Sequence, residues 1–340
     1  MSSHTARRFA SRVSGISCVS AIFGLAGAVA HADEFPPPSA PPAAAGLAPS
    51  PYGALAHAAD FASLTATAPA AAAIDPFHEL ETEDMFGFTE GTDFGEEGEQ
   101  SVEFENTGAF GKRGGRYSAI EQEIEAEGVP TQYFGYELSA HATGHDIKNV
   151  DGLGDLSGVN FSGLSGEFRY LVIGRGPGSP IGLTVVAEPE WERIDGESGA
   201  PTLDFSTTFR IAADTELIPN HLFAAANLIY APEIGKVTGE DWQRSSQIGA
   251  SAALAYRVTP KVALGGEVEY YRAYDGLGLQ TFDGNAVYVG PTAYITFNSK
   301  VTLAAAFSAE VAGNAAGQSQ NLDLTNFERY RTNLKLEFEF

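Results

Sequence analysis

The sequence predicts an all-β chain: an antiparallel transmembrane β-barrel of about twelve strands, preceded by a disordered N-terminal segment rich in alanine and proline. Three observations support this. From residue 100 or so onward, apolar and polar residues alternate in segments of roughly the length that crosses a bilayer as a tilted strand. The connections alternate between tight turns and longer glycine-rich stretches. Aromatic residues gather near the segment ends, as in the two girdles of membrane barrels.

The first 32 residues have the pattern of a cleaved secretory signal peptide. Three arginines precede an apolar run at 16–30, and Ala30-His31-Ala32 matches a small-residue cleavage site. This run is too short and wrongly flanked for a spanning helix. The only cysteine, Cys18, lies near the start of the run and not after it, so we expect no lipidation. We therefore expect export and a mature chain that starts at Asp33.

Composition excludes several classes of function for the mature chain. Without cysteine it has no disulfide, no thiol nucleophile and no cysteine metal ligand. The formal charge of −24 becomes −27 when the three arginines of the signal peptide are removed. A chain this acidic will not bind nucleic acid through its overall field. No other stretch is apolar enough for a transmembrane helix, so any membrane location requires strands.

Two segments lie between the signal peptide and the strands. Residues 33–75 are rich in alanine and proline, a composition that cannot build a core and indicates a disordered spacer. Residues 76–100 are acidic with scattered phenylalanines, as in "DMFGFTEGTDFGEEGE". We expect this segment to be a plug or a periplasmic lead-in to the barrel, which we assign to residues 101–340.

Each expected strand has one apolar face and one small or polar face. In one of them, for example, Ile181, Leu183 and Val185 alternate with Gly182 and Thr184. A soluble β-sandwich also alternates in this way, but it does not explain the alternation of short and long connections. The expected strands lie near 101–109, 115–127, 131–142, 160–173, 180–193, 202–213, 220–231, 246–258, 261–273, 286–297, 300–312 and 328–340.

The last seven residues, "LKLEFEF", place Leu334, Leu336, Phe338 and Phe340 on one face of a strand. This strand resembles the C-terminal signal of Gram-negative outer-membrane β-barrel proteins, which ends on an aromatic residue. The resemblance implies an outer-membrane location, contact with outer-membrane lipid and lipopolysaccharide, and recognition by the barrel assembly machinery. The chain also resembles, more loosely, uncharacterised barrels labelled as phenol-degradation-pathway outer-membrane proteins.

If the apolar faces meet lipid, the opposite faces line the lumen, and they are rich in carboxylates. The acids outnumber the bases, so pairing alone cannot neutralise them. One interpretation is a hydrated, salt-bridged interior that fills the barrel; the other is an aqueous channel that prefers cations. The expected lumen-lining residues are Glu121, Glu123, Glu125, Glu137, Glu167, Arg169, Glu188, Glu190, Glu192, Arg210, Arg257, Glu267, Glu269 and Lys335.

Groups that suggest catalysis or metal binding are few. The motif "HATGH" places His141 and His145 beside Asp146, but an i,i+4 spacing separates two side chains along a strand and no third ligand is specified. We therefore expect a solvated loop there. Ser165 lacks the G-x-S-x-G context of a hydrolase nucleophile. We expect no catalytic residue, no metal and no cofactor.

These observations together predict an outer-membrane barrel that acts as a passive pore or channel for small solutes, with an acidic lumen that prefers cations. Two alternatives stay open. The first is a closed structural or surface-interaction barrel that works through its extracellular loops. The second is a barrel hydrolase. An even strand count, with a long connection before the last strand, places both ends of the barrel domain in the periplasm.

Overall fold

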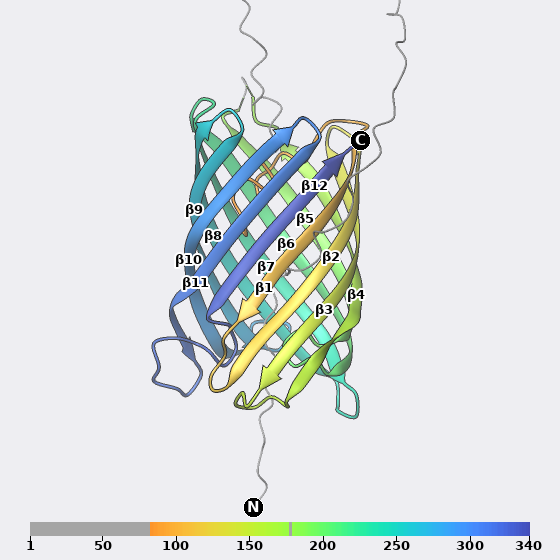
Figure 1. Ribbon diagram of the computed structural model, residues 1–340, viewed down its shortest axis with the longest axis vertical. Coiled ribbons are helices and arrows are strands. Elements are labelled where there is room, and N and C mark those ends of the chain that lie inside the picture. Colours follow the sequence, from red (N-terminus) through yellow and green to blue (C-terminus); the bar gives the residue numbers. More distant parts are fainter. Residues whose placement is uncertain (1–81, 177–178) are drawn as a thin grey trace, which may run out of the picture. The chain divides into compact units, whose positions relative to one another are not determined.

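The computed structural model describes residues 82–176 and 179–340, which form a closed antiparallel barrel of twelve strands (Figure 1). The expected signal peptide, the 33–75 spacer and residues 76–81 lie outside the described residues. The strands are β1 (Gln100–Phe110), β2 (Arg116–Thr131), β3 (Phe134–Lys148), β4 (Leu156–Ile173), β5 (Ile181–Ile194), β6 (Pro201–Ile218), β7 (Leu222–Val237), β8 (Gln243–Thr259), β9 (Val262–Asp275), β10 (Thr281–Asn298), β11 (Val301–Ala315) and β12 (Tyr330–Glu339).

The barrel closes where the first strand pairs with the last. β1 and β12 run antiparallel in continuous register, from Ser101 opposite Glu339 to Phe110 opposite Tyr330. The backbone N–H of Phe340 donates to the carbonyl oxygen of Gln100 at 3.0 Å, which extends the seam to the last residue. Closure leaves no unpaired strand edge, so the sandwich alternative is wrong.

The two ends of the barrel carry different connections. The turns at 132–133, 219–221, 260–261 and 299–300 lie at the end where β12 finishes, which we call the short-turn end (Figure 1). The opposite end, the long-loop end, carries 316–329. The connections differ in length less than we expected. Strands β3 and β4 continue into residues that we expected to form a long loop, and only 149–155 remain between them. The strands continue there because the residues of β3 keep the two-residue alternation of burial up to the end of the strand.

Exposed and buried side chains alternate along the strands, as expected from the alternation of apolar and polar residues. In β8, Leu254 and Tyr256 are exposed whereas Ala253 and Ala255 are buried. The exposed faces of the other strands also carry large apolar side chains, such as Leu138 and Phe168. The outer surface of the barrel is therefore apolar, and its inner wall is polar or small-sided. Among the described residues, no helix is long and apolar enough to cross a membrane.

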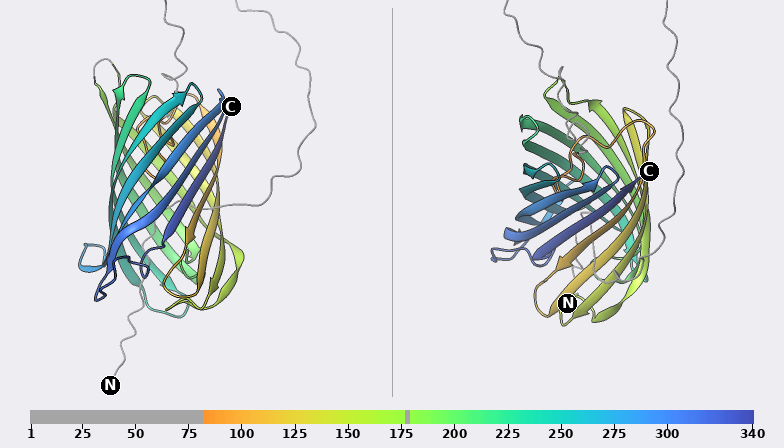
Figure 2. Two further views of the ribbon diagram at one scale, coloured as in Figure 1. Left: turned by 60° about the vertical axis from the view of Figure 1, so that its left-hand side comes forward. Right: turned by 45° about the horizontal axis from the view of Figure 1, so that its top comes forward.

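Most of residues 82–99, which precede β1, lies inside the barrel, whereas Glu96, Glu97 and Gly98 are exposed. We call 82–99 the plug. The orange segment within the ring of strands in Figure 2 is the plug. Its chain folds back on itself, since Glu83 N–H donates to the carbonyl oxygen of Asp93 and Gly91 N–H to that of Glu83. Thr82, Phe86 and Thr89 are fully buried there. The plug occupies the half of the lumen nearer the short-turn end.

Candidate functional site

The candidate site is the lumen together with its plug. The structure places all fourteen expected lumen-lining residues on the inward parity of their strands. Glu121, Glu123, Glu190 and Lys335 are half-buried and the other ten are buried: Glu125, Glu137, Glu167, Arg169, Glu188, Glu192, Arg210, Arg257, Glu267 and Glu269. Ten of the fourteen are carboxylic acids, so the inner wall carries more acids than bases.

One side of the plug is apolar and packs on small side chains. Met85 and Phe86 are buried against a patch formed by β7 to β11, whose inward positions are mostly alanine, for example Ala225, Ala255 and Ala304. The alanines leave room for the plug, and its two large side chains fill that room. At the tip, Gly87 has a φ of 86°, and a Cβ there would come within 2.8 Å of Ala306, Glu267 and Thr292. Only glycine fits this position.

Hydrogen bonds from strand side chains satisfy the backbone of the plug. Glu267 accepts from the backbone N–H of Phe88 at 3.3 Å and of Thr89 at 2.9 Å. Asn227 accepts from Glu90 N–H and donates to the carbonyl oxygen of Glu90, both at 2.8 Å. These contacts replace the secondary structure that the plug lacks, because buried backbone groups require partners.

Asp214 of β6 supports the second arm of the plug. Its carboxylate accepts from the hydroxyl of Thr82 at 2.5 Å and from the hydroxyl of Thr92 at 2.8 Å. Thr184 of β5 donates to the carbonyl oxygen of Thr92 at 2.8 Å. Arg175 approaches both Asp214, at 2.6 Å, and Asp93 of the plug, at 3.7 Å. Strands β5 and β6, with the connection that follows β4, therefore hold the plug at one end.

Ion pairs join the charged side of the plug to the wall. Arg169 of β4 pairs with Glu83 of the plug and also with Glu137, at 2.7 Å, and Glu167 on the wall. Arg210 of β6 pairs with Glu90 of the plug. The plug thus adds carboxylates to basic residues that already have acidic neighbours on the wall.

Lys335 of β12 makes a third charged attachment. Its ammonium lies 2.9 Å from Asp84 of the plug, 2.9 Å from Glu103 and 3.4 Å from Glu105. Burial raises the pKa of Asp84 but Lys335 lowers it, and the net shift is downward. Burial, opposed by Arg169, raises the pKa of Glu83 well above its ordinary value. The two neighbouring acids of the plug therefore differ in protonation behaviour.

Arg331 links the plug to the long-loop end. Its guanidinium lies 4.4 Å from the ring centre of Phe88 and about 5 Å from those of Tyr271 and Tyr288. It pairs with Glu269 at 2.8 Å and with Glu328, in the connection before β12, at 3.1 Å. Such cation–π contacts gain strength where water is excluded.

One cavity beside the plug is small and acidic. A cavity of about 50 Å³ lies between the plug and the wall. That is room for a few water molecules. The wall residues around it include Glu123, Glu125, Glu188, Arg169 and Arg210.

A larger cavity opens at the long-loop end, with a volume of about 790 Å³. It lies among the 149–155, 195–200 and 316–329 connections. Lys112 and Glu197 form an ion pair at 2.5 Å on its wall. Burial, opposed by Lys112, raises the pKa of Glu197.

The expectation of a solvated loop at "HATGH" is wrong. His141 and His145 are both buried on the inward face of β3, and only Asp146, paired with Arg116 at 2.8 Å, is near the surface. The strand continues through this motif because its residues keep the two-residue alternation of burial. The two histidines have different partners: His145 Nε2 lies 2.9 Å from the carbonyl oxygen of Gly196, and His141 lies beside Glu121 and Glu123.

Several residues that hold the plug were not among the expected site residues: Glu83, Asp84, Glu90, Asp214 and Asn227. Apolar residues recur among acids in the "DMFGF" stretch, and this amphipathic pattern is the signal for a segment buried against both an apolar and a basic surface. Asn227 and Asp214 lie at inward-facing positions of their strands, which the alternation of polar and apolar residues already indicated. Their partners on the plug were not predictable from that pattern.

Comparison with solved structures finds other barrels. The NanC porin shares 9% identity and a TM-score of 0.42, covering 70% of this chain and 98% of that chain. The COG4313 outer membrane channel from Pseudomonas putida F1 shares 13% identity and a TM-score of 0.47, covering 72% and 96%. The translocator domain of the autotransporter NalP from Neisseria meningitidis shares 11% and 0.41, covering 73% and 91%.

These low identities and TM-scores say nothing about the lumen of this chain or its solutes. A search of curated proteins finds no match. A family model, in contrast, matches residues 78–340, a range that spans the whole plug and the whole barrel. The chain therefore belongs to the family of unknown function DUF6662.

Proposed function

We propose that the protein is an outer-membrane channel for small solutes and that the plug closes its lumen. The observation that carries this proposal is the way in which the plug is held. It is a separate segment before β1, attached by hydrogen bonds and ion pairs and seated on a wall of alanines. A wall that only had to be filled could have been filled by its own larger side chains, as in narrower barrels.

Polar attachment is compatible with release. A side chain that leaves a hydrogen bond in a hydrated lumen exchanges it for water, and the net free-energy change per bond is about 0.5–1.5 kcal/mol, or about 1.5–3 kcal/mol where a charged group takes part. Only Met85, Phe86, Phe88 and Phe94 bury large apolar surface on docking. Displacement of the plug then exposes a passage lined by the inward faces of twelve strands.

We further propose that the lumen prefers cations. Ten of the fourteen wall residues named above are acids, and the plug brings more acids than bases. A field of one sign in a low-dielectric channel concentrates counter-ions. The solute class that fits is therefore small and either cationic or neutral.

The location and assembly of the protein follow from the same interpretation. Export through the signal peptide at 1–32 would deliver the chain to the periplasm, where the barrel assembly machinery would recognise β12 and insert the barrel among outer-membrane lipid and lipopolysaccharide. Phe338 packs edge-to-face on Phe104 across the closing seam, at 6.3 Å between ring centres, and Phe340 is exposed on the lipid side. The change Phe340→Ser should reduce the amount of heat-modifiable barrel in the outer membrane. A normal amount would contradict the role in assembly.

A closed barrel that works through its loops is the second candidate. The attachment of the plug to strands on several sides of the lumen favours it, because a docked plug narrows the passage. Nothing in the geometry of the described residues favours a hydrolase, and activity on lipid or peptide without conductance would be needed to support one.

Single-channel recording in planar bilayers separates these candidates. The full mature chain should be mostly silent with rare openings, whereas a variant lacking residues 82–99 should conduct steadily. Silence of both proteins, when both are folded by heat modifiability, would favour the closed barrel. A full chain that conducts as steadily as the deletion variant would show that the plug does not control the passage.

A further inference from the structure

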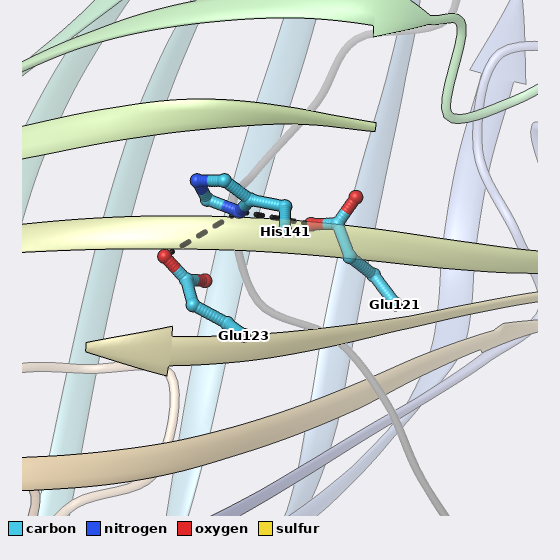
Figure 3. Close-up of side chains that lie close together, drawn as sticks. All are labelled: Glu121, Glu123 and His141. Carbon is cyan, nitrogen blue, oxygen red and sulfur yellow. Dashed lines mark ion pairs between the residues drawn. The ribbon is translucent and has the colours of Figure 1, made fainter. Parts of the chain in front are cut away.

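A cluster of three side chains midway along the lumen has the composition of a metal site. Glu121 and Glu123 extend from β2, and His141 extends from the neighbouring strand β3 (Figure 3). The strand register builds the cluster, because Glu123 lies opposite His141 and Glu121 lies opposite Thr143. The three ligand atoms all lie within 4.8 Å of one another.

The distances within the cluster suit a shared ion better than direct hydrogen bonds. His141 Nδ1 lies 3.5 Å from Glu121 Oε1 and 3.4 Å from Glu123 Oε1. Hydrogen bonds from nitrogen to oxygen span about 2.7–3.2 Å. Two ligands on a tetrahedral ion, each about 2.0–2.1 Å from the metal, are separated by roughly 3.3–3.4 Å. The two observed separations match the edges of such a tetrahedron.

The imidazole itself is a second observation that points to a ligand. The side chain of His141 is 2% exposed, and neither of its ring nitrogens has a hydrogen-bond partner among the described residues. A buried polar group without a hydrogen-bond partner is destabilising, and the only charged groups within ion-pair range of Nδ1 among the described residues are the two carboxylates. Figure 3 shows its ring nitrogen directed at the space between the two carboxylates. A cation placed there would satisfy Nδ1.

Neighbouring hydroxyl groups hold one carboxylate in position. Glu121 Oε2 accepts from the hydroxyl of Thr143 and, at 3.1 Å, from the hydroxyl of Ser162. Its other oxygen, Oε1, is the one directed at His141. Hydrogen bonds of this kind orient the ligands of metal sites.

We propose that Glu121, Glu123 and His141 bind one divalent transition-metal ion, with Zn²⁺ as the best fit, in the middle of the lumen. A nitrogen ligand together with two carboxylates favours such an ion over Mg²⁺ or Ca²⁺, which prefer oxygen alone. Two carboxylates and a neutral imidazole carry a charge that a divalent cation cancels. Glu123 also lines the 50 Å³ cavity, which has room for a water molecule as fourth ligand. This inference goes beyond the proposed channel and replaces the expectation of a lumen without metal.

Calorimetric titration of the full mature chain, folded in detergent, with Zn²⁺ alone tests the proposal. One ion per chain should bind, and an excess of Mg²⁺ should not compete. His141→Gln and Glu123→Gln should each weaken binding at least about tenfold, since even the loss of a residue that only orients a ligand costs this much. No zinc binding by the wild type would overturn the proposal and would leave His141 as a charged partner of the two carboxylates.

Two matched controls come from the same wall. His145→Gln changes the other inward histidine of β3, which lies beside Gly196 and away from the cluster. Glu125→Gln changes the neighbouring all-carboxylate group formed with Glu103 and Glu105. Both should bind zinc as the wild type does. Binding that survives His141→Gln but is lost in Glu125→Gln would place the ion in the carboxylate group and overturn the assignment.

X-ray absorption on the zinc-loaded wild type keeps the proposal falsifiable even if a variant fails to fold. The spectrum should show one imidazole nitrogen with oxygen ligands at about 2.0–2.2 Å. A shell with oxygen alone would contradict the proposal. Neither measurement depends on conductance, so failure of the channel hypothesis would leave this test intact.

Discussion

Two regions of the same lumen use carboxylates differently. The arginine region contains Arg169 and Arg210 with Glu83, Glu90, Glu137 and Glu167. The histidine region contains Glu121, Glu123 and His141. Strand β3 contributes to both, through Glu137 and His141 on one inward face. The carboxylates of one wall therefore lie in two different environments, one beside arginines and one beside a histidine.

The difference lies in the number of donors. A guanidinium offers five N–H groups in a fixed fork, so one arginine can bond several carboxylates at once. An imidazole Nδ1 offers one direction, yet two carboxylates converge on it. The arginine region joins carboxylates of the plug to carboxylates of the wall, whereas in our proposal an added cation completes the histidine region. The predictions below test this contrast.

The largest expected effect follows from breaking the arginine region. Arg169→Met removes the cation that joins Glu83, Glu137 and Glu167 and leaves buried carboxylates without compensation. We expect the free energy of unfolding, measured by denaturant titration in detergent, to fall by about 3–5 kcal/mol. Arg116→Met is the matched control: its pair with Asp146 is largely exposed, so the loss should be below about 1 kcal/mol. Equal losses of unfolding free energy in the two variants would contradict the assignment of Arg169 as a buried cation that joins the plug to the wall.

Asp93 of the plug tests how docking responds to pH. Burial, opposed by Arg175 and reinforced by Asp214, raises the pKa of Asp93 from 3.8 to about 6. Release of the plug restores the ordinary pKa, so the docked state binds this proton more tightly than the released state does. The contribution of Asp93 to docking is therefore complete below the ordinary pKa of 3.8 and is lost as pH rises through about 6.

Open probability in single-channel recordings should therefore rise between pH 4 and 7. The side chain of Asp93 is 45% exposed, so solvent screening should limit its effect to less than about tenfold. Asp93→Asn removes the titration and should flatten this part of the profile. A profile unchanged by Asp93→Asn would assign the pH dependence to other acids.

The surplus of acids in the wall of the lumen predicts a moderate preference for cations over anions. Cations should be enriched at low salt, and the preference should shrink as the screening length falls from about 30 Å at 0.01 M to about 3 Å at 1 M. Changing Glu188, Glu190 and Glu192 together to Gln keeps the volume and removes three charges. In the barrel without the plug, the reversal potential across a KCl gradient should move toward zero. Anion selectivity in the plug-free barrel that keeps all three glutamates would contradict the proposal that the lumen prefers cations.

The smallest expected effect comes from the histidine region in metal-free protein. Glu123→Gln removes one of two like charges that converge on a single nitrogen. The free energy of unfolding should change by less than about 1 kcal/mol or increase. A loss as large as that expected for Arg169→Met would show that the carboxylates of the histidine region are already fully paired.

The twelve strands and their parities were predictable because alternation with a period of two is local information. Closure followed, since each strand has one neighbour on either side and the first must meet the last, whereas the register of each strand pair was not predicted. Strand ends were less predictable: the extension of β3 through His141 and His145 lies in a polar, glycine-containing stretch that has the composition of a loop. Barrel strands tolerate such residues because the inward face is polar.

The plug was only partly predictable. Its acids and phenylalanines indicated a segment distinct from the spacer, but no periodicity fixed its path. Its position depends on contacts far apart in sequence, such as Glu90 with Asn227 and Lys335 with Asp84. The cluster of Glu121, Glu123 and His141 was missed for a related reason, because it needs the register of β2 against β3 and not a spacing within one strand.

A disulfide that locks the plug tests the central claim, that the plug controls the passage. A Cβ at position 182 of β5 would lie 3.0 Å from the Cβ of Thr92 on the plug. Disulfides need Cβ atoms about 3.5–4.5 Å apart, so the two Cβ atoms must separate by roughly half an ångström, and the Asp214 carboxylate, 2.6 Å from the new Cβ, must also move. The only native cysteine, Cys18, lies in the expected signal peptide, so the mature double variant carries just the engineered pair.

Single-channel recordings of the Thr92→Cys, Gly182→Cys double variant should be compared before and after reduction, with each single variant as a control. The oxidised protein should show no openings, and reduction should restore the rare openings of the reduced single variants. If the oxidised, crosslinked barrel opens as often as the reduced one, the plug does not control the passage and the central claim is wrong.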